Sequence, residues 1–288
     1  MTAGDTLRRL ADVHAGGSFS NARRSRRFEA FARLVDSLIA AKRRPVRILD
    51  IGGTNAFWEQ RGWTDRTDVE IVLVNLSAEP ARYEHIEGRA GDATDLSEFP
   101  DGAFDVVFSN SVIEHLATLD RQAAMAGEVR RLAPVYWVQT PNFWFPIEPH
   151  FLTPGWHWLP VSVRIALLQR RRWGWRGPCP DRAMATSLVR EVRLMRGREL
   201  RRLFPEAALQ RERIGPFVKS FVVLRGGDAA PQDAAAESAL AGGWADRPDR
   251  LAAGRVEVPG PDVAGAGRPR IPVGAPVGGQ RVARHRDV

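Results

Sequence analysis

Short runs of branched apolar residues, each followed by polar residues or glycine, recur between residues 46 and 140. Such runs are typical of buried strands. We expect strands at Val46 to Ile51, Val69 to Asn75, Ile86 to Ala90, Phe104 to Ser109 and Val135 to Gln139. They alternate with helical patterns over short connections, which predicts an α/β fold with a doubly wound, mostly parallel sheet.

Apolar residues at helical spacing predict the helices. Residues 20–42 carry Phe28, Phe31 and Val35 among basic residues, which indicates an amphipathic helix that leads into the sheet. After the first strand, residues 56–61 can begin a short helix, and residues 119–132 predict a longer one.

The pattern breaks after the fifth strand. Residues 141–180 contain five tryptophans and seven prolines, so they cannot form one long helix. Only residues 160–172 keep an amphipathic helical spacing. We expect an aromatic-rich lid insertion, at about residues 141–185, over the carboxyl edge of the sheet, where active-site lids are common.

Regular structure resumes at residue 186, with a helical pattern to residue 204. Ala208 to Ile214 and Phe217 to Leu224 then predict an antiparallel hairpin that turns at Gly215 and Pro216. Alanine, glycine, proline and arginine dominate residues 226–288, too few apolar residues for a core, so we expect disorder there. The predicted organisation is an N-terminal helical segment (1–44), one domain (45–225) and this tail.

Composition narrows the function classes. Cys179 is the only cysteine, which excludes a disulfide framework and a cysteine-based zinc site, and we predict no metal site. Neither a signal peptide nor an apolar stretch long enough to span a membrane is visible, so we expect a cytoplasmic protein. The net charge of +8 is spread along the chain without a recognition module, and we do not expect nucleic acid as a partner.

Candidate chemistry begins where the first strand ends. Asp50-Ile51-Gly52-Gly53-Thr54-Asn55 joins an acidic residue to two glycines and a polar turn before the short helix. Glycines let a backbone approach a ligand closely, and a helix N-terminus offers unpaired N–H groups. This combination predicts a nucleotide-type cradle at the carboxyl end of a first parallel strand.

Two further segments also place polar residues at the end of a predicted strand. They are Gly91-Asp92-Ala93 and residues 104–116, with the sequence FDVVFSNSVIEHL. With the cradle they resemble the class I S-adenosylmethionine-dependent methyltransferases, in particular small bacterial members of the type 11/12 kind. The resemblance covers about residues 45–225. It implies a Rossmann-like, seven-stranded sheet that ends in a hairpin, with S-adenosyl-L-methionine as the cofactor.

The resemblance also implies site residues. Cofactor contacts are expected from Asp50, Gly52, Gly53 and Thr54 after the first strand, Asn75 after the second, Asp92 and Ala93 after the third, and Asn110, Ser111 and His115 after the fourth. The chain departs from the family at Thr54 and Ala56, where glycine is usual. It departs again at Asn75, where a carboxylate usually meets the ribose, so weaker ribose binding is expected.

Other interpretations of these residues stay open. A nicotinamide dehydrogenase needs Gly-x-Gly-x-x-Gly and an acidic residue after the second strand, and this chain has neither. Asp92 could cap a helix at residues 94–99, and His115 could be structural. A methyltransferase-like domain that binds cofactor or a partner without turnover is the alternative function.

The methyl acceptor is expected to meet Glu148 and His150, which flank Pro149 in the aromatic insertion. In-line transfer from a sulfonium needs an aligned acceptor and, where the acceptor is protonated, a base. A histidine titrates near neutral pH and suits that role, so we predict His150 as base beside Glu148. The other interpretation is that both side chains only pair with neighbouring groups.

The tryptophans of the insertion have three interpretations. They could pack together, line a flat or lipid-like acceptor pocket, or contact an anionic membrane beside Arg164, Arg170, Arg171, Arg172 and Arg176. The sequence leaves the acceptor open among sugars, lipids, polyketide-like products and small metabolites.

Overall fold

A computed structural model describes residues 19–174 and 176–226. Its centre is a seven-stranded sheet in the order β3-β2-β1-β4-β5-β9-β8, in which β9 is antiparallel to both neighbours and the remaining pairs are parallel. The strands are β1 (Val46–Ile51), β2 (Val69–Asn75), β3 (Ile86–Ala90), β4 (Val106–Asn110), β5 (Val135–Pro141), β8 (Ala208–Ile214) and β9 (Phe217–Arg225). The predicted Rossmann-like fold with a terminal hairpin is confirmed.

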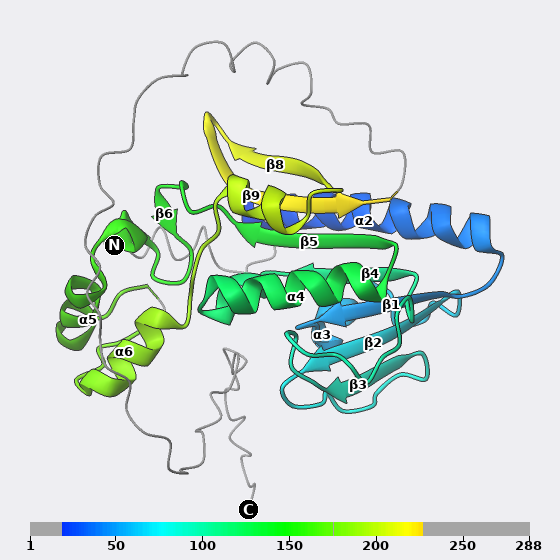
Figure 1. The fold of residues 1–288 in the computed structure, drawn as a ribbon, viewed down its shortest axis with the longest axis horizontal. Helices are drawn as coiled ribbons and strands as arrows, with labels where there is room; N and C mark the ends of the chain where they lie inside the picture. Colours follow the sequence, from blue (N-terminus) through cyan, green and yellow to red (C-terminus); the bar gives the residue numbers. More distant parts are fainter. Residues whose placement is uncertain (1–18, 175, 227–288) are drawn as a thin grey trace, which may run out of the picture. The chain divides into compact units, whose positions relative to one another are not determined.

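Helices cover both faces of the sheet (Figure 1). On one face, α2 (Phe19–Lys42) and α3 (Asn55–Glu59) bury an aromatic cluster in which the rings of Phe31 and Phe108 lie 4.5 Å apart. On the other, α4 (Leu119–Leu132) and α7 (Gly197–Leu203) pack Met125, Val129 and Leu200 against the strands. The sheet is therefore buried on both sides, as the apolar runs predicted.

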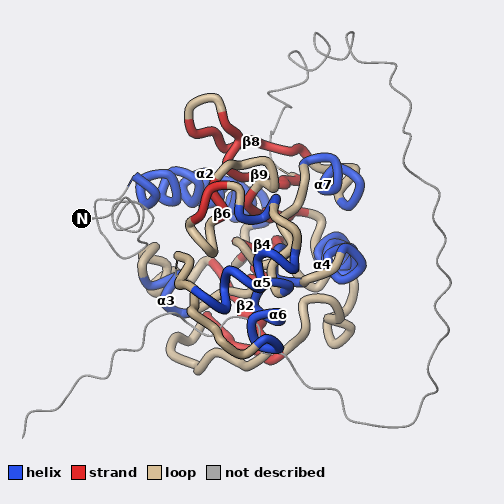
Figure 2. Tube along the Cα trace, turned by 90° about the vertical axis from the view of Figure 1, so that its left-hand side faces the viewer, coloured by secondary structure: helices blue, strands red, loops and turns tan. Residues whose placement is uncertain are grey.

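The segment between β5 and α7 forms its own small core. It contains β6 (Ile147–Glu148), β7 (Thr153–Pro154), η2 (Trp156–Trp158), α5 (Val161–Arg170) and α6 (Arg182–Arg190). Phe151, Trp156, Leu168 and Val189 are buried together there. In Figure 1, α5 and α6 lie on the side to which the parallel strands point, and Figure 2 shows both helices in front of the strand ends.

Several predicted elements have different bounds in the structure, and two of these differences have a clear cause. The fourth strand starts at Val106 and not at Phe104, because the N–H of Phe104 donates to Leu132 and the Asp105 side chain bonds to Arg44. The predicted helical segments between residues 186 and 204 are α6, which begins earlier, at Arg182, and α7, and residues 191–196 separate them. There the backbone leaves the helix to pair with residues after β4 and β5, since the N–H of Arg193 donates to the carbonyl of Glu114.

Within the described residues, no helix is both long and apolar enough to cross a membrane. The predicted disordered tail lies outside the described residues from position 227 onward, and the domain division stays a prediction.

Candidate functional site

The carboxyl ends of the parallel strands meet along one edge of the sheet. The N–H of Gly52 donates to the carbonyl of Val74 over 2.8 Å, and that of Gly91 donates to Asn75 over 2.7 Å. Further along, the N–H of Ser111 donates to the carbonyl of Gln139 over 3.0 Å. The four loops in which we predicted cofactor contacts are therefore neighbours on one edge.

Asp50 lies beneath this edge and is fully buried. Its Oδ2 accepts a hydrogen bond from the indole N–H of Trp58 over 2.9 Å. Burial raises the pKa of Asp50 to about 7, although the Trp58 bond opposes the shift. Asp50 thus supports the loop from inside, and its carboxylate does not reach the surface.

The two glycines after Asp50 are required by the protein's own packing. A Cβ on Gly53 would lie 1.9 Å from Asp50 Oδ2. Gly52 has φ +80°, which disfavours other residues, and a Cβ there would lie 2.3 Å from a methyl group of Val112. The first loop is consequently held against the loop that follows β4.

The N-terminus of α3 is less open than the sequence predicted. Thr54 caps it by accepting from the N–H of Phe57, and the Glu79 carboxylate accepts from the N–H of Asn55 over 3.2 Å. The Asn55 side chain also donates to Glu79. Because Glu79 and Thr54 accept from these two N–H groups, those groups are not free for a ligand, contrary to the expectation from the sequence.

Asn75 and Asp92 both have partners within the protein. The Asn75 amide donates to the carbonyl of Gly53 over 2.7 Å, which leaves its oxygen as an acceptor at the edge. Asp92 accepts from the N–H and hydroxyl of Thr94, and Arg121 donates to its carboxylate over 3.0 Å. Asp92 thus closes a local turn, but it caps no helix, because residues 94–99 are not helical; Ala93 is partly buried beside it.

The loop after β4 carries the next predicted residues. Asn110 ends the strand partly buried, and Ser111 has φ +60° with its hydroxyl donating to the Gln139 side chain. A 3-10 helix, η1 (Ile113–Leu116), follows and carries His115. The structure thus groups Asn110, Ser111 and His115 near β5, whereas Asp92 and Ala93 follow β3 at the far side of the sheet.

His115 and His150 meet beyond the ends of β4 and β5. Their Nε2 atoms lie 3.3 Å apart, and His150 Nδ1 lies 2.6 Å from Glu148 Oε1. Burial opposes protonation of His150, but the hydrogen bond and charge of Glu148 outweigh it, so the pKa of His150 is raised above its ordinary value. Glu148 is itself buried and also accepts from the N–H of Phe151.

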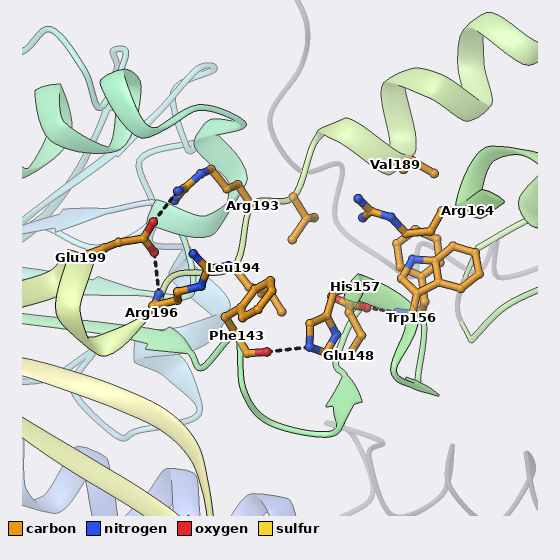
Figure 3. A pocket seen from close by; sticks show the side chains of 12 residues that line it. Phe143, Glu148, Trp156, His157, Arg164, Val189, Arg193, Leu194, Arg196 and Glu199 are labelled. Atoms are coloured by element: carbon orange, nitrogen blue, oxygen red, sulfur yellow. Dashed lines mark hydrogen bonds and ion pairs between the residues drawn. The ribbon is translucent and has the colours of Figure 1, made fainter. Parts of the chain in front are cut away.

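A cavity of about 240 Å³ lies beside Glu148. In Figure 3, Arg164 and Trp156 lie on one side of it, and Arg193, Arg196 and Glu199 lie on the other. The Nε atoms of Arg164 and Arg196 and the indole nitrogen of Trp156 are buried without a hydrogen-bond partner. The side chains of these three residues line the cavity, and its size suits a small molecule or part of a larger one.

Sequence reasoning missed several residues of this region. Glu114 is fully buried beside His115, and Glu191 Oε1 lies 3.7 Å from His115 Nδ1. Glu114 belongs to the Ile113-Glu114-His115-Leu116 string, so its position was a usable signal. No local sequence pattern points to Glu191, because it is the break between α6 and α7 that brings this residue close to His115.

Comparison with known families gives one match. Residues 49–134 match the family model described as "Methyltransferase domain". The comparison with curated proteins gave no match.

Solved structures similar to this chain include a Burkholderia thailandensis 1,6-didemethyltoxoflavin-N1-methyltransferase bound to 1,6-didemethyltoxoflavin and S-adenosylhomocysteine. It is 14% identical with a TM-score of 0.40, and the match covers 67% of this chain and 76% of that one. A Methanosarcina mazei S-adenosylmethionine-dependent methyltransferase is 15% identical, with coverage of 62% and 91% and a TM-score of 0.38. The trans-methyltransferase CalH, in complex with S-adenosylhomocysteine, is 19% identical, with coverage of 64% and 52% and a TM-score of 0.38.

Proposed function

We propose that this chain, whose residues 49–134 match the family model described as a methyltransferase domain, is a class I S-adenosylmethionine-dependent methyltransferase, and that it methylates an acidic small-molecule acceptor held in the cavity beside Glu148. The observation that carries the proposal is the common edge of strand ends, which runs from the Gly52 loop to the cavity beyond β5. Cofactor and acceptor can then lie next to each other.

The residues at this edge fit the cofactor. The backbone around Gly52 and Gly53 makes a sharp turn without side chains, which suits the methionine part. The free oxygen of Asn75 suits a ribose hydroxyl, and Asp92 with Ala93 would border the adenine. Asn110 and Ser111 would border the sulfur, next to His115. S-adenosylmethionine supplies an electrophilic methyl group on its sulfonium.

The chain's own contribution to the reaction is alignment and proton removal. Alignment can lower the barrier by about 7 to 11 kcal/mol in favourable cases. Glu148 lies against His150 Nδ1 and orients the ring, so that Nε2, which lies 3.3 Å from His115 Nε2 in the structure, would take a proton from the bound acceptor. We assign His150 as base and Glu148 as the residue that positions it.

Unpartnered donors in the cavity indicate the class of acceptor. A buried donor without a partner costs free energy that a ligand oxygen recovers. Three such donors, on Arg164, Arg196 and Trp156, favour a carboxylate or another anionic group. A neutral sugar or lipid-like acceptor would not use the positive charge of Arg164 and Arg196.

The test combines cofactor binding with a methyl-release assay on small-molecule extracts and acidic aromatic acceptors. We expect S-adenosylhomocysteine to bind, and His150→Ala to lower turnover at least about tenfold while cofactor affinity stays unchanged. His85→Ala is the control, because His85 lies beyond β2 with its ring against the carbonyl of Trp63. Unchanged turnover in His150→Ala would remove the assignment of this residue as base.

A non-catalytic domain is the alternative. The contact of Arg121 with Asp92 and the cover of Glu79 over α3 favour it, because both reduce what is offered to the cofactor. Cofactor binding without methyl transfer to any compound in the extracts would support this alternative.

A peripheral membrane contact is a second candidate activity of the aromatic segment. Trp158, Leu159 and Val163 are exposed at the start of α5, and Arg170 to Arg172 are exposed at its end. Such a surface fits anionic lipid. Co-sedimentation with phosphatidylglycerol vesicles at low salt tests it, and absence of binding there excludes it.

A further inference from the structure

We propose that Glu114, His115 and His150 bind a divalent transition metal ion of the zinc type. One ligand atom from each residue lies within 4.8 Å of the other two. The two Nε2 atoms are 3.3 Å apart. Two nitrogens that bind one tetrahedral zinc ion at about 2.0 to 2.1 Å lie about 3.3 to 3.4 Å from each other. The imidazoles are therefore already spaced as metal ligands.

Both imidazoles have a carboxylate on the far side of the ring. Glu148 Oε1 lies 2.6 Å from His150 Nδ1, and Glu191 Oε1 lies 3.7 Å from His115 Nδ1. Metal-binding histidines usually donate their other ring N–H to such a group, which leaves the lone pair of the inner nitrogen for the ion. When both inner nitrogens are deprotonated, their lone pairs face each other, and a cation between them would bind to both.

Glu114 provides an independent observation. Its side chain is fully buried, its Oε2 accepts from the hydroxyl of Thr140 over 2.9 Å, and its Oε1 is buried without a hydrogen-bond partner. A buried carboxylate oxygen with no partner is costly. A metal ion in the cluster would satisfy it directly.

The ligands stand on a preorganised frame. The N–H of Arg193 donates to the carbonyl of Glu114 over 2.7 Å, and the Gln122 amide donates to the carbonyl of Ile113 over 2.9 Å. These bonds fix η1, so Glu114 and His115 need little rearrangement to bind an ion. Preorganisation of this kind strengthens metal binding.

The ligand set selects the metal. Two imidazoles and one carboxylate suit zinc and its neighbours, whereas magnesium and calcium prefer oxygen ligands alone. Three protein ligands leave one tetrahedral position open, as in catalytic zinc sites.

The consequence for catalysis rests on the proposed function. The open position would bind a hydroxyl of the acceptor, whose O–H bond breaks as the metal lowers its pKa, and the proton passes to solvent. An electron pair of that oxygen then forms the O–CH₃ bond while the S–CH₃ bond breaks, which yields a methyl ether and S-adenosylhomocysteine. In this form His150 is a ligand, and the metal replaces it in activating the acceptor.

Zinc binding to the full chain tests the site without any activity assay. After dialysis against a chelator, titration with Zn²⁺ should show one site per chain, and Glu114→Gln and His115→Ala should each weaken it at least about tenfold. His85→Ala, a histidine outside the cluster, should bind zinc like the unaltered chain. Absence of a one-to-one site, or equal binding by all three variants, would overturn the proposal.

Folding and function are controlled separately. Circular dichroism and thermal unfolding show whether each variant keeps its fold. Should a variant fail to fold, the visible absorption of Co²⁺ bound to the unaltered chain decides, since four-coordinate binding supports the site and a six-coordinate aqua spectrum rejects it. Methyl release that survives chelation refutes the role of the metal in catalysis and leaves the methyltransferase. Zinc binding without methyl release refutes only the proposed function.

Discussion

At the ends of β1, β2 and β3 most polar side chains bond to the protein itself, Asn55 Oδ1 being an exception, whereas beyond β4 and β5 several polar atoms are buried without a partner. Trp58 donates to Asp50, Asn75 to Gly53 and Arg121 to Asp92. Of the nine buried side-chain polar atoms without a partner in the described residues, six lie on the acceptor side, on Glu114, His115, Trp156, His157, Arg164 and Arg196.

This difference separates two ways of building a binding site. The cofactor side is closed by the protein's own contacts and offers mainly backbone, so it should tolerate little change in its loops. The acceptor side keeps charged and donor atoms unsatisfied, and such atoms select a ligand because leaving them unpaired is costly. Changes on the first side should act on the fold and on the cofactor, and changes on the second side should act on the acceptor.

Substitution of Asp50 should give the largest effect, on the pH dependence of the free energy of unfolding. Its pKa is about 7 in the folded chain, against an ordinary value of 3.8. Between these values the folded state binds more protons than the unfolded state, so the free energy of unfolding falls as pH rises and levels off above about pH 7. Asp50→Asn keeps an oxygen for Trp58 and should remove this slope, up to about 4 kcal/mol in total.

Urea denaturation at several pH values between about 4 and 8 measures how the free energy of unfolding changes with pH in the unaltered chain and in Asp50→Asn. The variant should be the more stable chain at the upper end of that range and should lose its advantage toward the lower end. Parallel curves for the two chains would mean that Asp50 is ionised throughout, and that the cofactor side is less closed than its burial indicates.

Gly52→Ala should give the second largest effect, a loss of affinity for the cofactor. A side chain at φ +80° costs about 1 to 2 kcal/mol, and the added methyl would also displace Val112. We expect the Kd of S-adenosylhomocysteine to rise at least about thirtyfold, measured by calorimetry. Gly102→Ala is the matched control, because Gly102 has φ +66° with open space around it. Equal affinities in the two variants would place the cofactor away from this loop.

Most of the fold could be predicted from the sequence, because each strand is a local apolar run. The first three strands begin and end at the predicted residues. The start of the fourth strand was predicted two residues too early, because contacts of Asp105 with residues distant in the sequence keep it out of the strand. Its carboxylate binds Lys42, Arg44 and the N–H of Arg47.

The candidate site could be predicted only where it follows a strand end. Gly52, Asn75 and Asn110 lie at the shared edge because parallel register puts them there. The cluster around His115 depends on pairings between distant segments, such as Arg193 with Glu114, which no local pattern encodes. The partners of Asp92 were likewise hidden, since Arg121 reaches it from α4.

Arg164→Ala should give the smallest of these effects and should act on the acceptor side alone. Its guanidinium lines the cavity, and burial lowers its pKa, but Nε still has no hydrogen-bond partner. Benzoate is a suitable anionic probe, and Trp156 in the cavity wall reports its binding by fluorescence. Loss of one charge-assisted hydrogen bond should weaken benzoate about tenfold while the affinity for S-adenosylhomocysteine stays constant. Arg170→Ala, an exposed arginine on the same helix, should change neither value. If both arginine variants bind benzoate alike, the unpartnered donors do not select an anion. The cofactor side and the acceptor side then differ only in how their side chains pack.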